Sequence, residues 1–369
     1  MTLRSPLFEE HVALGARMVT FGGWELPLSY RGVIAEHRAV RERVGLFDVS
    51  HLGKLIVDGP GAASVLDRLL PGKIVSLPLW RARYNLLLTP AGGIVDDVFV
   101  YRRPESFVVV PNAANTPAVL DAIRTAVGAA VGEEASVIDA RARWAILALQ
   151  GPAARIMAEE LLVDANRLGL HSFMDIQLGG VEVQFARTGY TGELGFEIFV
   201  PSAEAVSVWR ELLEAGESHG IQAAGLGARD TLRLEMGYPL HGQDISADTN
   251  PLEAGLGWVI DWSKPDFRGR KSLERVRRQG PQRRLVGLVT QTVGIPRSGQ
   301  AIFDGGRRVG EVTSGNFSPT LKKGIALGYV LPEATAPDTI LQVDVRGKRV
   351  PARVTRPPFV GRGRGSLSH

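Results

Sequence analysis

The order of apolar and polar positions along the chain predicts a few helices separated by many short strands. Residues 115–130 begin with Asn-Thr-Pro and continue as an apolar-rich run, which predicts a capped helix. Residues 202–219 predict a second helix, because apolar side chains recur on one face and Gly220 follows its end. Residues 228–235 predict a third helix, and residues 272–279 a fourth with a basic outer face.

Short runs rich in β-branched and aromatic residues lie between these helices, bounded by Gly, Pro or Asn. Such runs predict strands. They are residues 54–58, 93–102, 107–110, 145–149, 181–186 and 195–200. Because strands and helices do not alternate as in a doubly wound parallel sheet, we expect an α+β fold with antiparallel sheets.

The composition changes near residue 280, after which the chain is nearly all strand and turn. Asp304-Gly305-Gly306 lies between apolar runs and predicts a hairpin. The predicted strands are residues 285–290, 301–303, 309–313, 325–330, 340–345 and 350–354. We therefore expect residues 281–369 to form a separate C-terminal β-barrel or jelly-roll domain.

Composition limits the chemistry. With 369 residues, 44% of them hydrophobic, the chain suits a globular protein of two or three domains. The absence of cysteine excludes thiolate catalysis, disulfides and cysteine-ligated metal sites. No two of the seven histidines have i, i+4 spacing, and there is no phosphate loop or Gly-x-Ser-x-Gly motif. We expect no metal, no PLP and no nucleotide.

Charge and hydropathy bear on location and partners. The longest apolar runs are too short to span a bilayer, and the N-terminus, with Glu9 and Glu10, has no apolar signal core. We expect a cytoplasmic protein with no membrane partner. The net charge of +4 is small for this length, so we expect no nucleic-acid partner, and the basic residues after Asp344 suit a charged strand edge.

Two aspartates follow the glycine pair in the block GGIVDD at residues 92–97. Successive side chains of a strand point to opposite faces, so Asp96 and Asp97 are not expected to form a close dyad. One carboxylate can face a cleft, partly desolvated, where it would stabilise a cationic transition state. An equally weighted interpretation is a turn whose aspartates cap free N–H groups.

The block GELGFEIFV at residues 192–200 places Glu197 on the non-core face of a strand, beside Gly195. A carboxylate there can accept two N–H bonds from a planar ligand. The commoner case is a solvent-facing glutamate. In the following helix, Arg229 and Arg233 are four residues apart and repel each other, which an internal carboxylate or an anionic ligand would offset.

Four aromatic residues are weaker candidates for stacking on a flat heterocycle, since most aromatics are ordinary core. They are Tyr84, Tyr101, Tyr190 and Trp262. Taken together with the charged blocks, they favour a polar, nitrogen-rich small molecule held by carboxylates and an arginine.

In this order along the chain, the three charged blocks resemble the glycine cleavage system T-protein family, the aminomethyltransferases. Further matching blocks extend the resemblance over nearly the whole chain. They are PLFEEH at 6–11, FGGWELPL at 21–28, GLFDVSH at 45–51, GQD at 242–244, TSGNFSPTL at 313–321 and RPPFV at 356–360. The set as a whole is specific, although any one block alone is weak.

The resemblance implies a cloverleaf of three domains around a folate channel, two interleaved α+β domains and a C-terminal jelly roll or barrel. On this basis we expect residues 1–52 to group with 140–170 and 222–280, and residues 53–139 with 171–221. The implied reaction moves the methylene of an aminomethyl group on the lipoylated H-protein to tetrahydrofolate. Its products are 5,10-methylenetetrahydrofolate, ammonia and the dihydrolipoyl H-protein.

The resemblance also implies residue roles. Asp97 aligns with the catalytic aspartate, which would stabilise positive charge near the folate's bridging nitrogen. Glu197 aligns with the glutamate that binds the pterin's donor edge, and Arg229 with the folate-binding arginine. The other implied folate contacts are Tyr84, Tyr101, Tyr190, Leu52, Asn112 and Asn115, with Arg362 matched only loosely.

The same fold serves other functions, so three alternatives stay open. The first is a tetrahydrofolate-dependent demethylase with a different methyl donor. The second is a non-catalytic folate-binding accessory protein; the lack of cysteine and the presence of Asp97 favour the enzyme. The third is nucleic-acid binding through the basic tail, which predicts affinity that falls steeply with salt.

Overall fold

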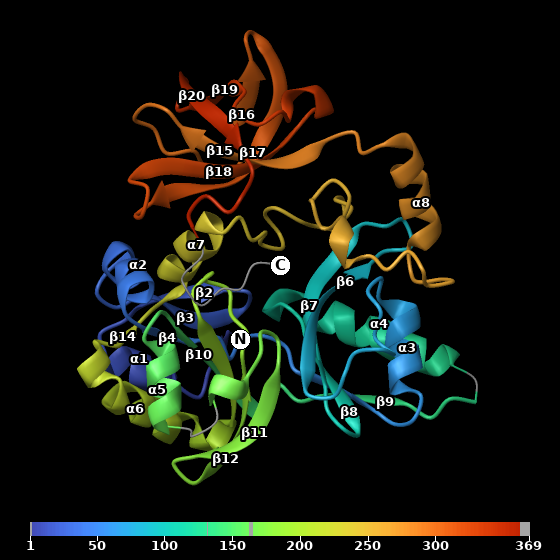
Figure 1. Cartoon of the computed structure of the whole chain (residues 1–369), viewed down its shortest axis with the longest axis vertical. Coiled ribbons are helices and arrows are strands. Elements are labelled where there is room, and N and C mark those ends of the chain that lie inside the picture. Colours follow the sequence, from blue (N-terminus) through green and yellow to red (C-terminus); the bar gives the residue numbers. More distant parts are fainter. Residues whose placement is uncertain (1, 131, 162–164, 362–369) are drawn as a thin grey trace.

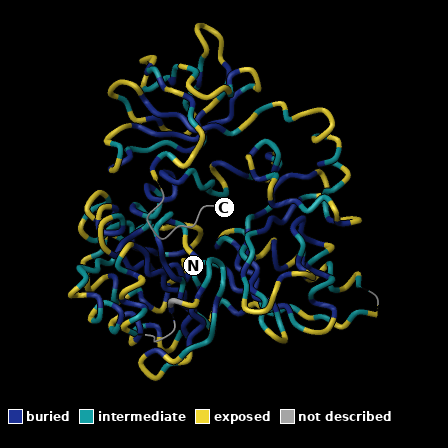
Figure 2. Tube along the Cα trace, viewed as in Figure 1, coloured by how far each residue is buried: buried dark blue, intermediate teal, exposed yellow. Residues whose placement is uncertain are grey.

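The computed structural model describes residues 2–130, 132–161 and 165–361, which form three lobes (Figure 1). Two lobes are built on largely antiparallel sheets and the third is a closed barrel. Buried positions concentrate inside each lobe, while exposed positions follow the loops (Figure 2). No helix in the described ranges is long and apolar enough to cross a membrane.

The first lobe contains a six-stranded sheet in the order β11-β12-β13-β10-β4-β14. Its strands are β4 (Gly45–Asp48), β10 (Trp144–Gln150), β11 (Phe173–Leu178), β12 (Val181–Ala186), β13 (Gly195–Pro201) and β14 (Gln222–Ala223). Its helices are α1 (Phe8–Ala13), α2 (Val33–Glu42), α5 (Ala154–Leu161), α6 (Ala205–Ala215) and α7 (Leu226–Glu235). A small sheet of β1 (Leu3–Arg4), β2 (Arg17–Phe21) and β3 (Trp24–Ser29) adjoins it.

The second lobe contains a five-stranded sheet in the order β6-β7-β8-β5-β9. Its strands are β5 (Leu55–Asp58), β6 (Arg81–Leu88), β7 (Ile94–Arg102), β8 (Ser106–Val110) and β9 (Ser136–Asp139). Helices α3 (Ala62–Leu69) and α4 (Thr116–Ala129) pack on one face, where Val98 and Val100 of β7 join an apolar core. The alternate residues of β7 therefore face away from these helices, toward the first lobe.

The C-terminal lobe is a closed barrel in the order β15-β18-β17-β16-β19-β20. The strands are β15 (Arg284–Thr290), β16 (Ala301–Asp304), β17 (Arg307–Ser318), β18 (Lys323–Val330), β19 (Ile340–Val345) and β20 (Lys348–Thr355). The expected hairpin at residues 304–306 joins β16 to β17. The expected C-terminal barrel is thus confirmed; β17 is longer than the sequence pattern indicated because it continues through the polar stretch Thr313–Ser318.

The expected grouping of segments into the first two lobes needs two corrections. Residues 171–221 do not join residues 53–139, because β13 pairs along its whole length with β10, so that β11, β12 and β13 belong to the first sheet. Residues 245–280 do not join residues 1–52. Their apolar side chains, including Leu256 and Leu273, pack against Leu86 and Leu88 of β6. The two lobes are still interleaved in sequence, as expected.

Two buried carboxylates attach the barrel to the first lobe. Glu235, the last residue of α7, accepts hydrogen bonds from Ser318 Oγ at 2.6 Å and Thr320 Oγ1 at 2.9 Å. It also accepts from Arg41 of α2, with Nη2 at 2.9 Å. His37 Nε2 also lies 3.3 Å from its Oε2. Burial alone would raise the pKa of Glu235, but the hydrogen bonds, led by that with His37, outweigh it and lower the pKa to about 2.

The second carboxylate belongs to Asp244. It accepts from Arg233 Nη1 at 2.7 Å and from Ser314 Oγ at 2.8 Å, and its backbone oxygen accepts from Tyr329 of the barrel at 2.8 Å. Arg233 also forms an ion pair with Asp230. Internal carboxylates that offset the repulsion between Arg229 and Arg233 are therefore present, and both of them, Asp230 and Asp244, pair with Arg233.

Candidate functional site

Asp96 and Asp97 of β7 share one hydrogen-bond donor. Asp96 is fully buried and Asp97 half-buried, as expected for opposite faces of a strand. Yet the amide Nδ2 of Asn112 lies 2.8 Å from Oδ1 of Asp96 and 2.8 Å from Oδ1 of Asp97. The two carboxylates do not bond each other, as expected for opposite faces of a strand, but Asn112, the second residue after β8, reaches both and bridges them.

The remaining oxygens of the pair are also bonded. Asp96 accepts from the backbone N of Asn112 at 2.9 Å and from Nδ2 of Asn115 at 2.7 Å. Oδ2 of Asp97 accepts from the Tyr84 hydroxyl at 3.1 Å. Asn115 in turn lies 2.9 Å from Nδ1 of His241, whose Nε2 lies 3.2 Å from the Ile94 carbonyl oxygen. This network fixes the Asp97 carboxylate while leaving part of it accessible.

Burial governs the electrostatics of the pair. It raises the pKa of Asp96 to about 7, helped by the negative charge of Asp97 and opposed by the bonds from Asn115 and Asn112. Burial also raises the pKa of Asp97, although the bonds from Tyr84 and Asn112 favour its carboxylate. Near neutral pH this strand therefore holds a carboxylate that is poorly solvated and ready to stabilise a cation.

These shifts predict a pH dependence. Burial raises the pKa of Asp97, so its negative charge is lost at a higher pH than that of an ordinary aspartate, whose pKa is about 3.9. If the Asp97 carboxylate is needed for turnover, kcat should already fall with decreasing pH while ordinary aspartates are still ionised. A pH profile of kcat between pH 4 and 9 checks this, and a rate that stays constant down to pH 4 would contradict it.

Glu197 lies in the middle of β13, half-buried. Its Oε2 accepts from Thr188 Oγ1 at 2.5 Å and from the Tyr101 hydroxyl at 3.4 Å. Tyr101 belongs to β7 of the second lobe, so this contact joins the strand of the aspartates to the strand of the glutamate. Oε1 of Glu197 accepts no hydrogen bond from the described residues, which leaves it available to a ligand.

The space beside Gly195 is filled by a side chain of the protein itself. A Cβ at residue 195 would lie 2.4 Å from Nε2 of Gln150. Gln150 is buried and donates to the carbonyl oxygens of Thr188 and Phe196 at 3.2 and 3.3 Å. The glycine is thus needed because Gln150 of β10 packs directly opposite it.

Arg229 has an unpaired guanidinium in the described part of the chain. It lies in the first turn of α7, with its guanidinium carbon 4.8 Å from the centre of the Tyr190 ring. Its backbone N donates to the Gly225 carbonyl oxygen at 3.1 Å, but its guanidinium donates no hydrogen bond to any described residue. Burial lowers the pKa of Arg229, and the charge of Glu197 acts in the opposite direction. A partly buried arginine without an acceptor next to a carboxylate is a receptor for a polar ligand.

The predicted tyrosines have different surroundings. Tyr84 stacks on Trp258, with ring centres 5.7 Å apart, and Trp258 is 70% exposed. Tyr190 stacks on Tyr238. Tyr101 is buried in the core shared by the first two lobes, against which Leu52 packs, so only its hydroxyl reaches Glu197. Tyr84 and Tyr190 can therefore offer ring surface, whereas Tyr101 orients the glutamate.

One residue selected from the sequence is not brought to this site. Trp262 packs on Phe267, at the outer side of the second lobe. Arg362 lies outside the described residues. Asp96 joins the site as the second carboxylate of its pair, and Thr188, His241 and Trp258 join it without having been selected from the sequence. His241 directly precedes the matched block at 242–244, which is the one signal that could have found it.

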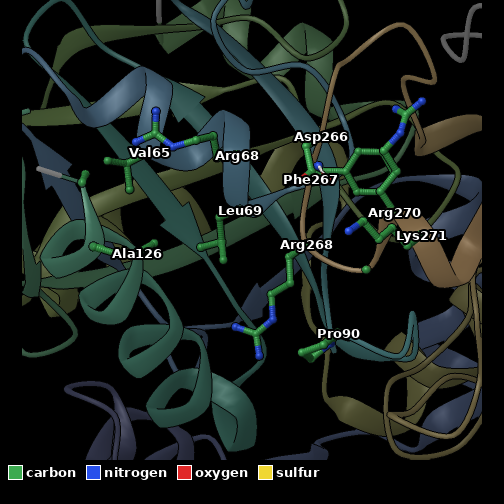
Figure 3. Close-up of a pocket in the computed structure, with 13 residues that line it drawn as sticks. Val65, Arg68, Leu69, Pro90, Ala126, Asp266, Phe267, Arg268, Arg270 and Lys271 are labelled. Carbon is green, nitrogen blue, oxygen red and sulfur yellow. Dashed lines mark hydrogen bonds between the residues drawn. The ribbon is translucent and has the colours of Figure 1, made fainter.

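A separate cavity of about 500 Å³ lies on the helical face of the second lobe (Figure 3). Val65, Leu69 and Phe267 supply apolar walls, and Arg268 and Lys271 add positive charge. None of the predicted site residues lines it. In the described ranges, no cluster of three or more His, Cys, Asp or Glu side chains could hold a metal ion.

Comparisons with known proteins find one family along nearly the whole chain. Residues 7–264 match the family described as the GCVT N-terminal domain, and residues 283–361 the glycine cleavage T-protein C-terminal barrel domain. The aminomethyltransferase of Rubrobacter xylanophilus is 46% identical over 363 residues, which is 98% of this chain and 95% of that protein. That of Halothermothrix orenii is 41% identical over 359 residues, or 97% and 99%.

A solved structure shows the same fold. The crystal structure of the glycine cleavage system aminomethyltransferase T from Bartonella henselae has a TM-score of 0.91 with this chain at 36% identity, covering 98% of this chain and 99% of that one. The match includes the two antiparallel lobes and the barrel. The chain therefore belongs to the glycine cleavage T-protein family, the aminomethyltransferases.

Proposed function

We propose that this protein transfers the methylene of an aminomethyl group, carried on the lipoyl arm of the H-protein, to tetrahydrofolate. The carbon loses its bonds to the lipoyl sulfur and to the amino nitrogen, and gains bonds to N5 and N10 of the folate. The two N–H protons of the folate end on the thiol and on ammonia. The products are 5,10-methylenetetrahydrofolate, ammonia and the dihydrolipoyl H-protein.

Arg229 is the observation that carries the proposal. Its guanidinium has no acceptor among the described residues, yet it lies close enough to Glu197 for the two charges to interact. A reduced pterin fits this pair, because its amino group and N3–H are donors for Glu197 and its 4-oxo group is an acceptor for Arg229. A flat ring with adjacent donors and acceptor would satisfy both side chains at once.

Asp97 supplies the chemistry in this proposal. As the methylene passes from one carrier to the other, positive charge develops on the carbon and on the folate nitrogen bonded to it. A fixed carboxylate with few water neighbours stabilises this charge more than the neutral ground state. Tyr84 and Asn112 hold the carboxylate by hydrogen bonds, so little reorganisation is needed.

Replacing Glu197 by alanine should raise the Kd for tetrahydrofolate by about 10- to 100-fold, since the pterin loses a charged acceptor worth about 1.5–3 kcal/mol. Isothermal titration under anaerobic conditions measures this. Glu182→Ala is the matched control, because Glu182 is exposed on β12 of the same sheet. An unchanged Kd in Glu197→Ala would remove this residue from the pterin site.

A tetrahydrofolate-dependent demethylase remains the second candidate, because it would use the same folate contacts and differ only in the methyl donor. The two functions are distinguished by which one-carbon donor the protein turns over. Ammonia release from aminomethylated H-protein, with equimolar 5,10-methylenetetrahydrofolate, supports the aminomethyltransferase. Turnover of a small N-methylated amine, with no ammonia from the H-protein substrate, would support the demethylase.

A further inference from the structure

A buried imidazole next to the candidate site has no hydrogen-bond partner in the described part of the chain. His51 is 3% exposed, and its Nδ1 is fully enclosed without a donor or acceptor in reach. No side-chain or backbone group of the described residues bonds its other ring nitrogen. Nearly all buried polar side chains in native proteins are hydrogen-bonded, and an unpaired one costs about 1–3 kcal/mol.

His51 lies next to two parts of the candidate site, the segment that carries Asn112 and the guanidinium of Arg229. It lies in the turn after β4, directly before Leu52, and the backbone N of Gly53 donates to the Pro111 carbonyl oxygen at 2.9 Å. Pro111 precedes Asn112, the residue that bridges the two aspartates. On the other side, the positive charge of Arg229 acts on the imidazole. The ring of Phe21 meets its face edge-on at 6.0 Å.

The surroundings keep this imidazole neutral. Burial is the largest cause that lowers the pKa of His51 to about 3; the charges of Arg229 and Lys54 act in the same direction, and Asp48 opposes them. A neutral imidazole carries one N–H donor and one acceptor nitrogen. It can therefore bond a ligand atom of either kind without adding a second cation beside Arg229.

We propose that His51 forms a hydrogen bond with bound tetrahydrofolate, at the corner of the pterin where the 4-oxo group meets N5. This inference rests on the proposed function. The charge of Glu197 acts on Arg229, and the charge of Arg229 acts on His51. The pterin edge presents groups in a matching order: the amino group and N3–H, then the 4-oxo oxygen, then N5.

A purely structural histidine is the alternative, and it predicts the opposite response to an apolar substitution. A histidine kept for packing and bonding stabilises the ligand-free protein, so replacing it lowers the melting temperature. A histidine kept for the ligand is an unsatisfied polar group until the folate binds. Replacing it by an apolar residue of similar volume then removes a cost in the ligand-free protein.

The test compares His51→Leu with the unaltered protein. We expect the Kd for tetrahydrofolate to rise about tenfold, while the melting temperature of the ligand-free protein rises by about 2 °C. His51→Gln, which keeps a polar atom near the position of Nε2, the ring nitrogen that is not enclosed, should restore most of the affinity. His51→Met carries the same prediction as His51→Leu should the leucine variant not fold.

An unchanged Kd in the folded leucine or methionine variant would overturn the inference. Glu197→Ala and Arg229→Gln, titrated in parallel, separate this failure from failure of the proposed function. If both weaken tetrahydrofolate binding and His51→Leu does not, only the role of His51 is wrong. If none of the three changes the Kd, the folate does not bind here and both proposals fail.

Discussion

Replacing Asp97 by asparagine is expected to lower kcat by about 10²- to 10³-fold, equivalent to about 3–4 kcal/mol of transition-state stabilisation. The carboxylate accepts from Tyr84 and Asn112 in a poorly solvated setting, so its charge is not replaced by water. An asparagine has nearly the same shape and no charge. Because the lost interaction forms only as the one-carbon unit becomes cationic, the Kd for tetrahydrofolate should change little.

Single-turnover ammonia release from aminomethylated H-protein measures the chemical step directly. Asp121→Asn is the control, because Asp121 is exposed on α4 of the same lobe. A drop in kcat confined to Asp97→Asn supports the role, provided that the variant's melting temperature is unchanged or higher, as expected when a carboxyl with a raised pKa is removed at neutral pH. Ammonia release at the unaltered rate in Asp97→Asn would exclude electrostatic catalysis by this residue.

Replacing Glu235 by glutamine is expected to lower the free energy of unfolding by about 3–5 kcal/mol, because it removes one charge from a buried ion pair and hydrogen-bond cluster. Arg41 would keep Glu193 as a partner, but Ser318 and Thr320 of the barrel would face an amide N–H₂ instead of a carboxylate oxygen. The loss of stability should appear first where α7 contacts the barrel.

Urea unfolding, together with amide exchange of residues 318–320, checks this expectation. Glu333→Gln serves as the comparison, since Glu333 forms only an exposed ion pair with Arg307 and should change stability by less than about 0.5 kcal/mol. The depressed pKa of Glu235, about 2, adds a pH signature. Its stabilisation is present above the ordinary glutamate pKa and is lost as pH falls from about 4.5 toward 2. Equal stability of both variants would mean that the cluster does not hold the barrel in place.

Local sequence patterns predicted the C-terminal barrel and many element bounds, because alternation and turn residues act over a few residues. They did not predict which segments share a sheet. The pairing of β13 with β10 joins residues 195–201 to residues 144–150, and nothing in either strand specifies the partner. Residues 245–280 likewise pack on β6 through contacts distant in sequence, and only the fold shows this.

At the site, too, the sequence could not predict contacts between residues that are distant along the chain. The strand pattern placed Asp96 and Asp97 on opposite faces, which is right, but it could not show that Asn112 arrives from the next strand and bonds both. Gly195 indicated a close approach, and the approaching group is Gln150 rather than a ligand. The choice of Asp97, Glu197 and Arg229 came from the family resemblance, since spacing alone left each with an ordinary structural interpretation.

A crystal structure with tetrahydrofolate bound is the most direct measurement of the central claim, that one site between the first two lobes holds the folate and stabilises its cationic one-carbon unit. The account predicts the pterin amino group within hydrogen-bond distance of Glu197, its 4-oxo oxygen at Arg229, and the Asp97 carboxylate beside N10. Density for the folate elsewhere, such as in the outer cavity between α3, α4 and α8 (Arg270–Gln279), would contradict it.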